Sequence, residues 1–219
     1  MFERIARRYD LNNRLHSLWR DQAWRRQTVH LAGVTPGQTV LDLATGTGDL
    51  AGWFARLTPA GRIVGLDSCQ GMLDVARRKF PEQNLEWLCA SAAGVPFDDG
   101  CFDVAAMAFG IRNVAKPEAV LAEMYRALKS GGRAVLLEFA QPTSLPGRLL
   151  WWYVSHVMPV TAGVIAGDAT GAYRYLAASI RTFCGAAELD ELMQHAGFTG
   201  VRRHAMSLGL AVVHVGVKS

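Results

Sequence analysis

The chain has 219 residues, of which 50% are hydrophobic and 19% charged, with a formal net charge of +4. This length fits one domain with a sizeable core, and the apolar content excludes an intrinsically disordered chain. The four cysteines lack C-x-x-C spacing and neighbouring histidines, so we expect reduced thiols and no metal site; they are Cys69, Cys89, Cys101 and Cys184. Acids interrupt any signal-peptide pattern at the N-terminus, which favours a cytoplasmic protein.

A helical pattern runs through residues 1–33, which we expect to form an N-terminal cap. Seven arginines stand against three acids in the first thirty residues. Because the planar guanidinium suits phosphate groups, this segment could face an anionic membrane, contact nucleic acid, or simply be a solvated helix face.

Apolar strands alternate with helical segments in the middle of the chain. We predict strands at residues 39–43, 63–67, 85–89, 103–109 and 133–138, and helices at 49–57, 70–79 and 117–128. Strands that are almost continuously apolar are buried on both faces, as in a parallel α/β sheet. Helices are also expected at 172–183 and 188–195. Two closing strands, one beginning near residue 197 and one at 210–217, have no helix between them and must pair antiparallel.

The first predicted strand runs into the turn Gly46-Thr47-Gly48, and Asp67 ends the second strand. Glycines let the backbone approach a ligand closely, a helix N-terminus offers N–H groups, and an acid at this spacing can bind ribose hydroxyls. These features predict a site for the adenosine part of a cofactor. Residues 46–51 also fit the dinucleotide pattern G-x-G-x-x-A, so a nicotinamide or flavin dehydrogenase is an alternative.

Two features favour S-adenosyl-L-methionine over a dinucleotide. Asp49 directly follows the turn, where its charge opposes a pyrophosphate but suits a sulfonium and an amino group. In S-adenosylmethionine-dependent methyltransferases of the large α/β class, the last strand of the sheet also runs antiparallel to its neighbours. We therefore predict a Rossmann-like class I methyltransferase sheet, mostly parallel with an antiparallel final strand, in one domain spanning residues 1–219.

Residues 142–183 are predicted to form a helical insertion after the fifth strand. Residues 149–166 read LLWWYVSHVMPVTAGVIA, near the length of a membrane span, but Pro159 breaks the run and His156 lies inside it. Tryptophan and tyrosine favour the membrane–water boundary. We interpret the segment as a substrate-covering helix that lines an apolar pocket or dips into the interface, with a plain buried helix as the alternative.

A set of motifs in the same order resembles the ubiquinone/menaquinone biosynthesis C-methyltransferases, the UbiE family, over almost the whole chain. The motifs include residues 2–10, 43–51, 65–68, 95–97, 109–114 (FGIRNV), 128–139, 173–176 (YRYL), 179–181 and 209–218. The resemblance implies S-adenosyl-L-methionine as cofactor and a prenylated naphthoquinol or benzoquinol as substrate, with demethylmenaquinol first. It also implies peripheral contact with the inner face of the membrane, leaves a homodimer open and implies no nucleic-acid partner.

The expected cofactor-binding residues are Gly46, Thr47, Gly48, Asp49, Asp67, Ser68, Met72, Ser91, Ala92 and Ala108. By resemblance, Thr47 contacts the cofactor, Asp67 binds the ribose, Ser91 and Ala92 border the adenine, and Ala108 faces the methionine end.

The chain departs from the family pattern at four positions. Ser91 and Ala93 stand where the family usually has Asp or Asn and an acid, Ala108 where serine is common, and Ala178 where glutamate is common. One hydrogen bond contributes about 0.5–1.5 kcal/mol, so we expect weakened cofactor binding and not its loss.

Methylation of a quinol carbon requires ionisation of a ring hydroxyl. With a phenol-like pKa of about 10, ionisation at pH 7 costs about 4 kcal/mol, which a base or a cation can offset. Arg112, just past the fourth strand, is the expected electrostatic stabiliser, and Asn113 is expected to orient the quinol oxygen. The candidates for the proton relay are Asp168, Tyr173, Tyr175 and His156. A benzoquinol of the ubiquinone pathway, a specialised metabolite, or a catalytically weak scaffold in a quinone-synthesis complex are the alternatives.

Overall fold

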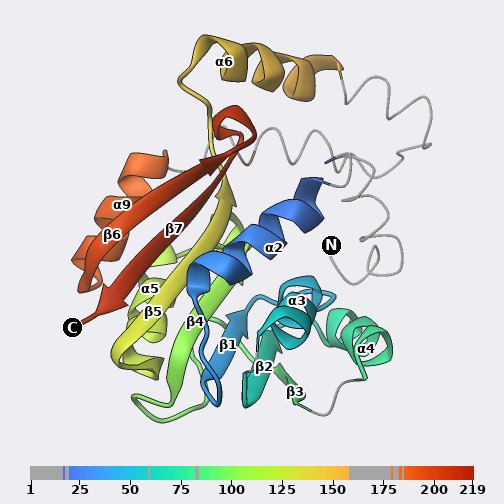
Figure 1. The fold of residues 1–219 in the computed structure, drawn as a ribbon, viewed down its shortest axis with the longest axis vertical. Coiled ribbons are helices and arrows are strands. Elements are labelled where there is room, and N and C mark those ends of the chain that lie inside the picture. Colours follow the sequence, from blue (N-terminus) through green and yellow to red (C-terminus); the bar gives the residue numbers. More distant parts are fainter. Residues whose placement is uncertain are drawn as a thin grey trace.

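The computed structural model describes residues 17, 20–58, 60–81, 84–157, 179, 183 and 185–219. Within them, seven strands form one sheet in the order β3-β2-β1-β4-β5-β7-β6 (Figure 1). The strands are β1 (Thr39–Leu43), β2 (Arg62–Asp67), β3 (Leu85–Cys89), β4 (Phe102–Ala108), β5 (Leu128–Phe139), β6 (Phe198–Met206) and β7 (Ala211–Lys218). Strands β1 to β5 pair in parallel, and β7 runs antiparallel between β5 and β6. The predicted sheet, with its antiparallel final strand, is confirmed.

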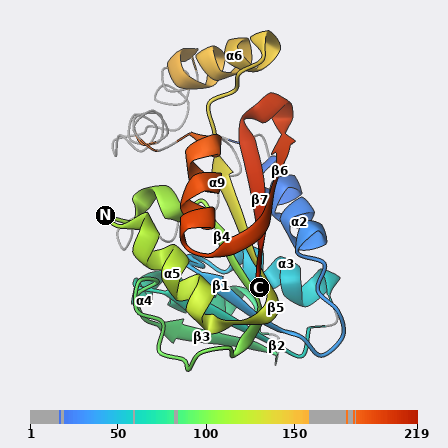
Figure 2. The ribbon, with the colours of Figure 1, turned by 90° about the vertical axis from the view of Figure 1, so that its left-hand side faces the viewer.

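Helices cover both faces of the sheet (Figure 2). They are α2 (Arg20–Ala32), α3 (Asp49–Leu57), α4 (Gln70–Lys79), α5 (Pro117–Ala127), α6 (Leu145–Trp152) and α9 (Ala186–His195), with short turns of 3₁₀-helix at η1 (Ile111–Asn113) and η3 (Ser207–Gly209). On one face, Trp24 of α2 and Phe54 of α3 pack in the same core as Val40. On the other face, Leu121 of α5 packs with Leu41. Successive residues of β1 thus enter opposite cores, as the pleat of a strand requires.

The predicted boundaries of β1, α3, α4 and β3 agree with the structure, whereas those of the other strands differ by one or more residues, most of all at β5. Strand β5 begins at Leu128, because Gly131, with φ of 77°, lets the chain bulge opposite β4 and pair before the bulge as well as after it. Strand β4 ends at Ala108, because Phe109 turns into the left-handed region with φ of 58°.

The two expected helical additions to the sheet are described only in part. Helix α2 begins at Arg20, so residues 1–16 of the predicted cap lie outside the described residues. The insertion begins with α6, which lies above the carboxyl end of β5 (Figures 1 and 2), and continues into the π-helix η2 (Tyr153–Val157). In the part of the chain that the structure describes, no helix is both long and apolar enough to cross a membrane.

Candidate cofactor and active site

A cavity of about 310 Å³ lies at the carboxyl ends of the central parallel strands. This is the edge at which open α/β sheets bind ligands, and the volume falls in the range of small-molecule sites, about 300–1,000 Å³. The structure brings most of the expected cofactor residues to its wall: Gly46, Asp67, Ser68, Met72, Ser91, Ala92 and Ala108. Asn113, from the expected catalytic set, lines it too.

Asp67 stands at the end of β2 and is oriented by backbone groups on both sides. Its Oδ2 accepts a hydrogen bond from the N–H of Gly46 at 2.8 Å, and its Oδ1 accepts one from the N–H of Cys69 at 2.8 Å. Each carboxylate oxygen has a further lone pair. Asp67 can therefore accept the two hydroxyls of a ribose without losing its own supports.

The two glycines of the turn have different physical roles. A Cβ on Gly46 would meet no atom within 4 Å, so this side of the turn is open to a ligand. A Cβ on Gly48 would lie 2.5 Å from the ring of Trp87, and Gly48 does not line the cavity. Gly48 is thus required by packing between the turn and β3, whereas Gly46 provides the close approach predicted from the sequence.

Asp42 supports the turn from below and is a residue that the sequence analysis missed. Its Oδ2 accepts hydrogen bonds from the hydroxyl of Thr45 at 2.5 Å and from the N–H of Ala51 at 3.1 Å. Complete burial raises the pKa of Asp42 to about 7. An acid inside the otherwise apolar strand β1 was the signal that could have identified it.

The structure does not bring Thr47, Gly48 or Asp49 to the cavity wall. Asp49 is buried at the start of α3, where its Oδ1 accepts a hydrogen bond from Lys79 Nζ at 2.5 Å and its Oδ2 accepts one from Gln22 at 3.2 Å. Although burial raises the pKa of the Asp49 carboxyl, the nearby charges of Arg25 and Lys79 outweigh burial and lower it. Asp49 therefore links α2 and α4 to the turn, and its expected contact with the methyl donor stays a prediction.

The loop after β3 forms the expected adenine side of the cavity. Ser91 and Ala92 both line it, as does Ala93. The hydroxyl of Ser91 accepts a hydrogen bond from the N–H of Ala93 at 3.2 Å. Its O–H can still donate to a ligand. Three of the departures from the family pattern thus lie on the wall: Ser91, Ala93 and Ala108.

The turn after β4 forms the opposite side of the cavity. Ala108, Phe109, Gly110 and Asn113 line it, and the Asn113 amide donates to the carbonyl of Phe109 at 3.2 Å. Arg112 is not on the wall. Its guanidinium donates to Glu138 at 2.5 Å and to the Phe109 carbonyl at 2.9 Å.

Glu138 was also missed by the sequence analysis. Its side chain is 2% exposed, at the carboxyl end of β5. A charged residue after a continuously apolar run was the signal for it, since a buried carboxylate requires a partner.

The remaining candidates lie away from the cavity or outside the described residues. His156 is exposed on η2, where its Nδ1 lies 2.8 Å from the Ser155 hydroxyl and its ring stacks on Trp152. Asp168, Tyr173, Tyr175 and Ala178 fall outside the residues that the structure describes. Among the described residues, no group of three or more acidic, histidine or cysteine side chains could bind a metal.

Comparisons with known proteins identify the family of the chain. The family model described as "ubiE/COQ5 methyltransferase family" matches residues 1–218. The demethylmenaquinone methyltransferase of Thermus thermophilus is 45% identical over 219 residues, which are 99% of this chain and 99% of that protein. The ubiquinone/menaquinone biosynthesis C-methyltransferase UbiE of Haemophilus ducreyi is 39% identical over 224 residues, covering 100% of this chain and 86% of that one.

Solved structures share the fold at lower identity. A methyltransferase in complex with the Haloferax volcanii Trm112 activator superposes with a TM-score of 0.74 at 20% identity, over 100% of this chain and 97% of that one. An S-adenosylmethionine-dependent methyltransferase of Thermotoga maritima superposes with a TM-score of 0.69 at 23% identity, over 100% of this chain and 98% of that one. With a class I sheet, a cavity at its carboxyl edge and a family match over nearly every residue, the chain belongs to the ubiE/COQ5 family of methyltransferases.

Proposed function

We propose that this chain transfers a methyl group from S-adenosyl-L-methionine to a ring carbon of a prenylated quinol, with a demethylmenaquinol-type substrate. The observation that carries the proposal is the cavity, in which Asp67 and the open side of Gly46 face the turn that carries Asn113. Identity of 45% to a protein named demethylmenaquinone methyltransferase supports the substrate class.

The residues present fit the cofactor. Asp67 would accept hydrogen bonds from the ribose hydroxyls, the open side of Gly46 would let the cofactor approach the chain closely, and Met72 would provide an apolar contact. Ser91 and Ala92, on the cavity wall, would border the adenine. Direct contact of Thr47 and Asp49 with the cofactor stays a prediction.

Bound S-adenosyl-L-methionine supplies an electrophilic methyl group on a sulfonium. The ring carbon of the ionised quinol would take this methyl group in place of its ring proton, which the proton relay would receive. Asn113 is placed on the wall to orient the quinol oxygen, and Ala108 leaves room beside it. Fixing the ring carbon in line with the methyl removes much of the entropic part of the barrier.

Three further catalytic roles complete the proposal. Arg112 contributes a positive charge next to the quinol subsite, although it shares that charge with Glu138. Asp168 and Tyr173 are proposed for the proton relay. Replacement of Tyr173 by phenylalanine should lower turnover and leave cofactor affinity unchanged, because a relay residue acts only after binding.

The direct test is incubation of the protein with isotopically labelled S-adenosyl-L-methionine and a panel of prenylated naphthoquinols and benzoquinols, followed by mass analysis. We expect one labelled methyl group on a carbon of the naphthoquinol. Methylation of benzoquinols alone would reassign the substrate. Cofactor binding without methylation of any quinol would favour a scaffold.

We also propose peripheral contact with the cytoplasmic face of a membrane, through an apolar tip formed by α6, η2 and η3. Its residues are exposed although they are large and apolar: Leu145 (70%), Leu149 (63%), Trp152 (57%), Tyr153 (46%) and Leu208 (58%). Exposed apolar groups of this kind mark interaction sites, and tryptophan and tyrosine favour the membrane–water boundary. Arg148, on the same helix, is exposed and can meet anionic headgroups.

Vesicle sedimentation tests the apolar tip. We expect the protein to sediment with vesicles of phosphatidylcholine and phosphatidylglycerol, and Leu149→Glu to release it. The matched control is Leu57→Glu, which changes an exposed leucine on α3. A wild-type protein that stays in the supernatant with both neutral and anionic vesicles would refute the proposal. Whether the chain forms a homodimer stays a prediction that analytical ultracentrifugation can test.

A further inference from the structure

A buried ion pair joins the carboxyl ends of β4 and β5 behind the cavity. The side chains of Arg112 and Glu138 are 8% and 2% exposed, and Arg112 Nη1 lies 2.5 Å from Glu138 Oε1. Glu138 also accepts the N–H of Phe139 at 2.8 Å and the N–H of Arg112 at 3.4 Å. The Glu138 carboxylate thus accepts hydrogen bonds from both the backbone N–H and the guanidinium of Arg112.

The same guanidinium fixes a strained turn. Phe109 adopts φ of 58°, a left-handed conformation that costs a non-glycine residue about 1–2 kcal/mol. The Phe109 carbonyl accepts hydrogen bonds from Arg112 Nη1 at 2.9 Å and from the Asn113 amide at 3.2 Å. Strain of this kind persists only where the surroundings oppose its release, and here the Arg112–Glu138 pair supplies the opposing contacts.

The aromatic packing around the pair leaves the guanidinium little freedom. Arg112 lies over the ring of Phe139 at 5.3 Å and over the ring of Phe109 at 5.9 Å, and the two rings pack against each other at 4.5 Å. Arg25 of α2 lies over the Phe109 ring at 5.3 Å. The ion pair therefore fixes the geometry of the turn as well as the position of the charge that Arg112 contributes.

We infer that Glu138 is a positioning residue for methyl transfer, which acts through Arg112 to fix the strained 109–113 turn that carries Phe109 and Asn113 to the cavity. This inference rests on the proposed function for its effect on turnover. A displacement of about 1 Å in a positioning group can lower the rate about 10²-fold, so a released turn should affect kcat far more than cofactor binding at the ribose.

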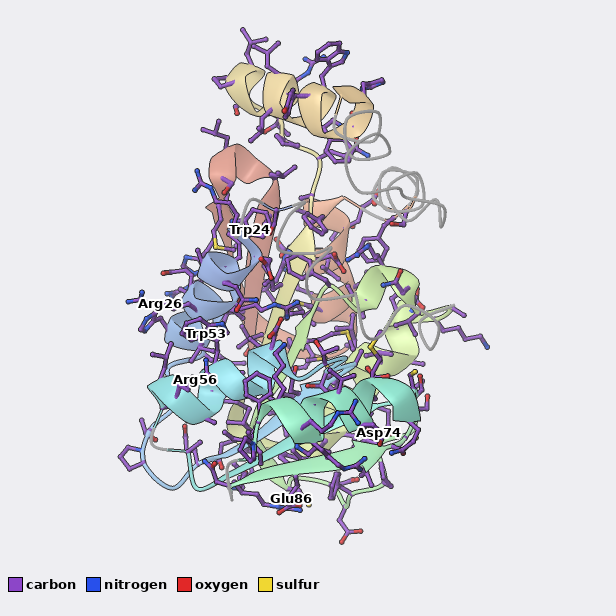
Figure 3. All side chains as sticks on the ribbon, turned by 90° about the vertical axis from the view of Figure 1, so that its right-hand side faces the viewer. Trp24, Arg26, Trp53, Arg56, Asp74 and Glu86 are labelled. Atoms are coloured by element: carbon purple, nitrogen blue, oxygen red, sulfur yellow. The ribbon has the colours of Figure 1, made fainter. Side chains whose placement is uncertain are left out.

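The test compares Glu138→Gln with a matched control, Glu86→Gln. Glu86 also pairs with an arginine, Arg62 at 2.7 Å, but that pair is exposed on β3 and β2 at the end of the molecule opposite α6 (Figure 3). Three quantities are measured: kcat and KM for methyl transfer, the Kd of S-adenosyl-L-methionine by calorimetry, and amide hydrogen exchange of a peptide covering residues 109–114.

We expect Glu138→Gln to lower kcat at least about tenfold, to keep the cofactor Kd within about threefold, and to raise exchange in residues 109–114. Glu86→Gln should change none of these. If Glu138→Gln does not fold, the double variant Arg112→Gln/Glu138→Gln, which leaves no buried charge unpaired, is used in its place with the same expectation.

Unchanged turnover or unchanged exchange would overturn the inference, as would a cofactor affinity that falls in step with kcat. If the wild-type protein methylates no quinol, the proposed function fails instead. The exchange measurement needs no substrate and still shows whether Glu138 fixes the turn.

Discussion

Replacing Asp67 by asparagine should separate cofactor binding from folding. Asp67 accepts two backbone N–H groups and lines the cavity, where it is placed to accept two ribose hydroxyls. Asparagine keeps one acceptor oxygen, and its amide would face the N–H of either Gly46 or Cys69. A hydrogen bond to a charged group contributes about 1.5–3 kcal/mol, so the loss of one such bond should raise Kd by roughly 10- to 160-fold.

Isothermal calorimetry with S-adenosyl-L-methionine measures this loss. The matched control is Asp74→Asn, which changes an exposed aspartate on α4 that bonds Gln70 and Arg77 (Figure 3). An Asp67→Asn protein that binds the cofactor within about threefold of wild type would refute the assignment of Asp67 to the ribose. Equal losses in the two variants would show an effect of charge alone.

Three further predictions follow from the buried groups around the cavity. The urea midpoint of the Asp42→Asn variant, measured relative to that of the wild type at the same pH, should rise from pH 5 to pH 8. Burial raises the pKa of Asp42 to about 7, so the stability of the protonated folded form is present below the unfolded value of 3.8 and is lost as the pH rises through 7. An alanine in the left-handed conformation costs about 1–2 kcal/mol. Gly48→Ala should destabilise the fold by more than this strain, because the new Cβ would lie 2.5 Å from Trp87. Gly46→Ala places its Cβ in open space, so it should cost only the strain and should weaken cofactor binding. Arg112→Ala should lower the free energy of unfolding by about 3–5 kcal/mol, since it leaves a buried carboxylate unpaired, and should lower turnover.

Each of these predictions has a contradicting result. A difference between Asp42→Asn and wild type that does not change with pH would mean that the carboxyl is ionised throughout. Equal destabilisation by Gly48→Ala and Gly46→Ala, measured in urea, would remove the packing argument. An Arg112→Ala protein that unfolds and turns over like wild type would show that the ion pair with Glu138 contributes nothing.

The elements around the cofactor turn were predictable because their signals are local. The boundaries of β1, α3 and α4 follow from short apolar runs, a glycine turn and an amphipathic period, all within a dozen residues. Asp67 was recognisable for the same reason, since its distance from the turn is set by one helix and one strand. The antiparallel pairing of β6 and β7 was predictable because no helix separates them.

The partners of the charged residues could not be read from the sequence. Asp49 follows the turn directly, yet its charge is bound by Lys79, which is 30 residues away along the chain. Arg112 is expected to stabilise the quinol oxygen, and the structure shows that its guanidinium pairs with Glu138, 26 residues later. A buried charge is stabilised by whichever opposite charge the fold brings near, and chain spacing says nothing about that.

The sheet, the glycine turn and the acid at the end of β2 could be predicted because neighbouring residues specify them. The side chains that line the cavity, and the charged pairs that support it, depend on contacts between residues far apart in the chain. Phe109 is an example, since its left-handed conformation is held by contacts from β5 and α2 as well as by hydrogen bonds from Arg112 and Asn113.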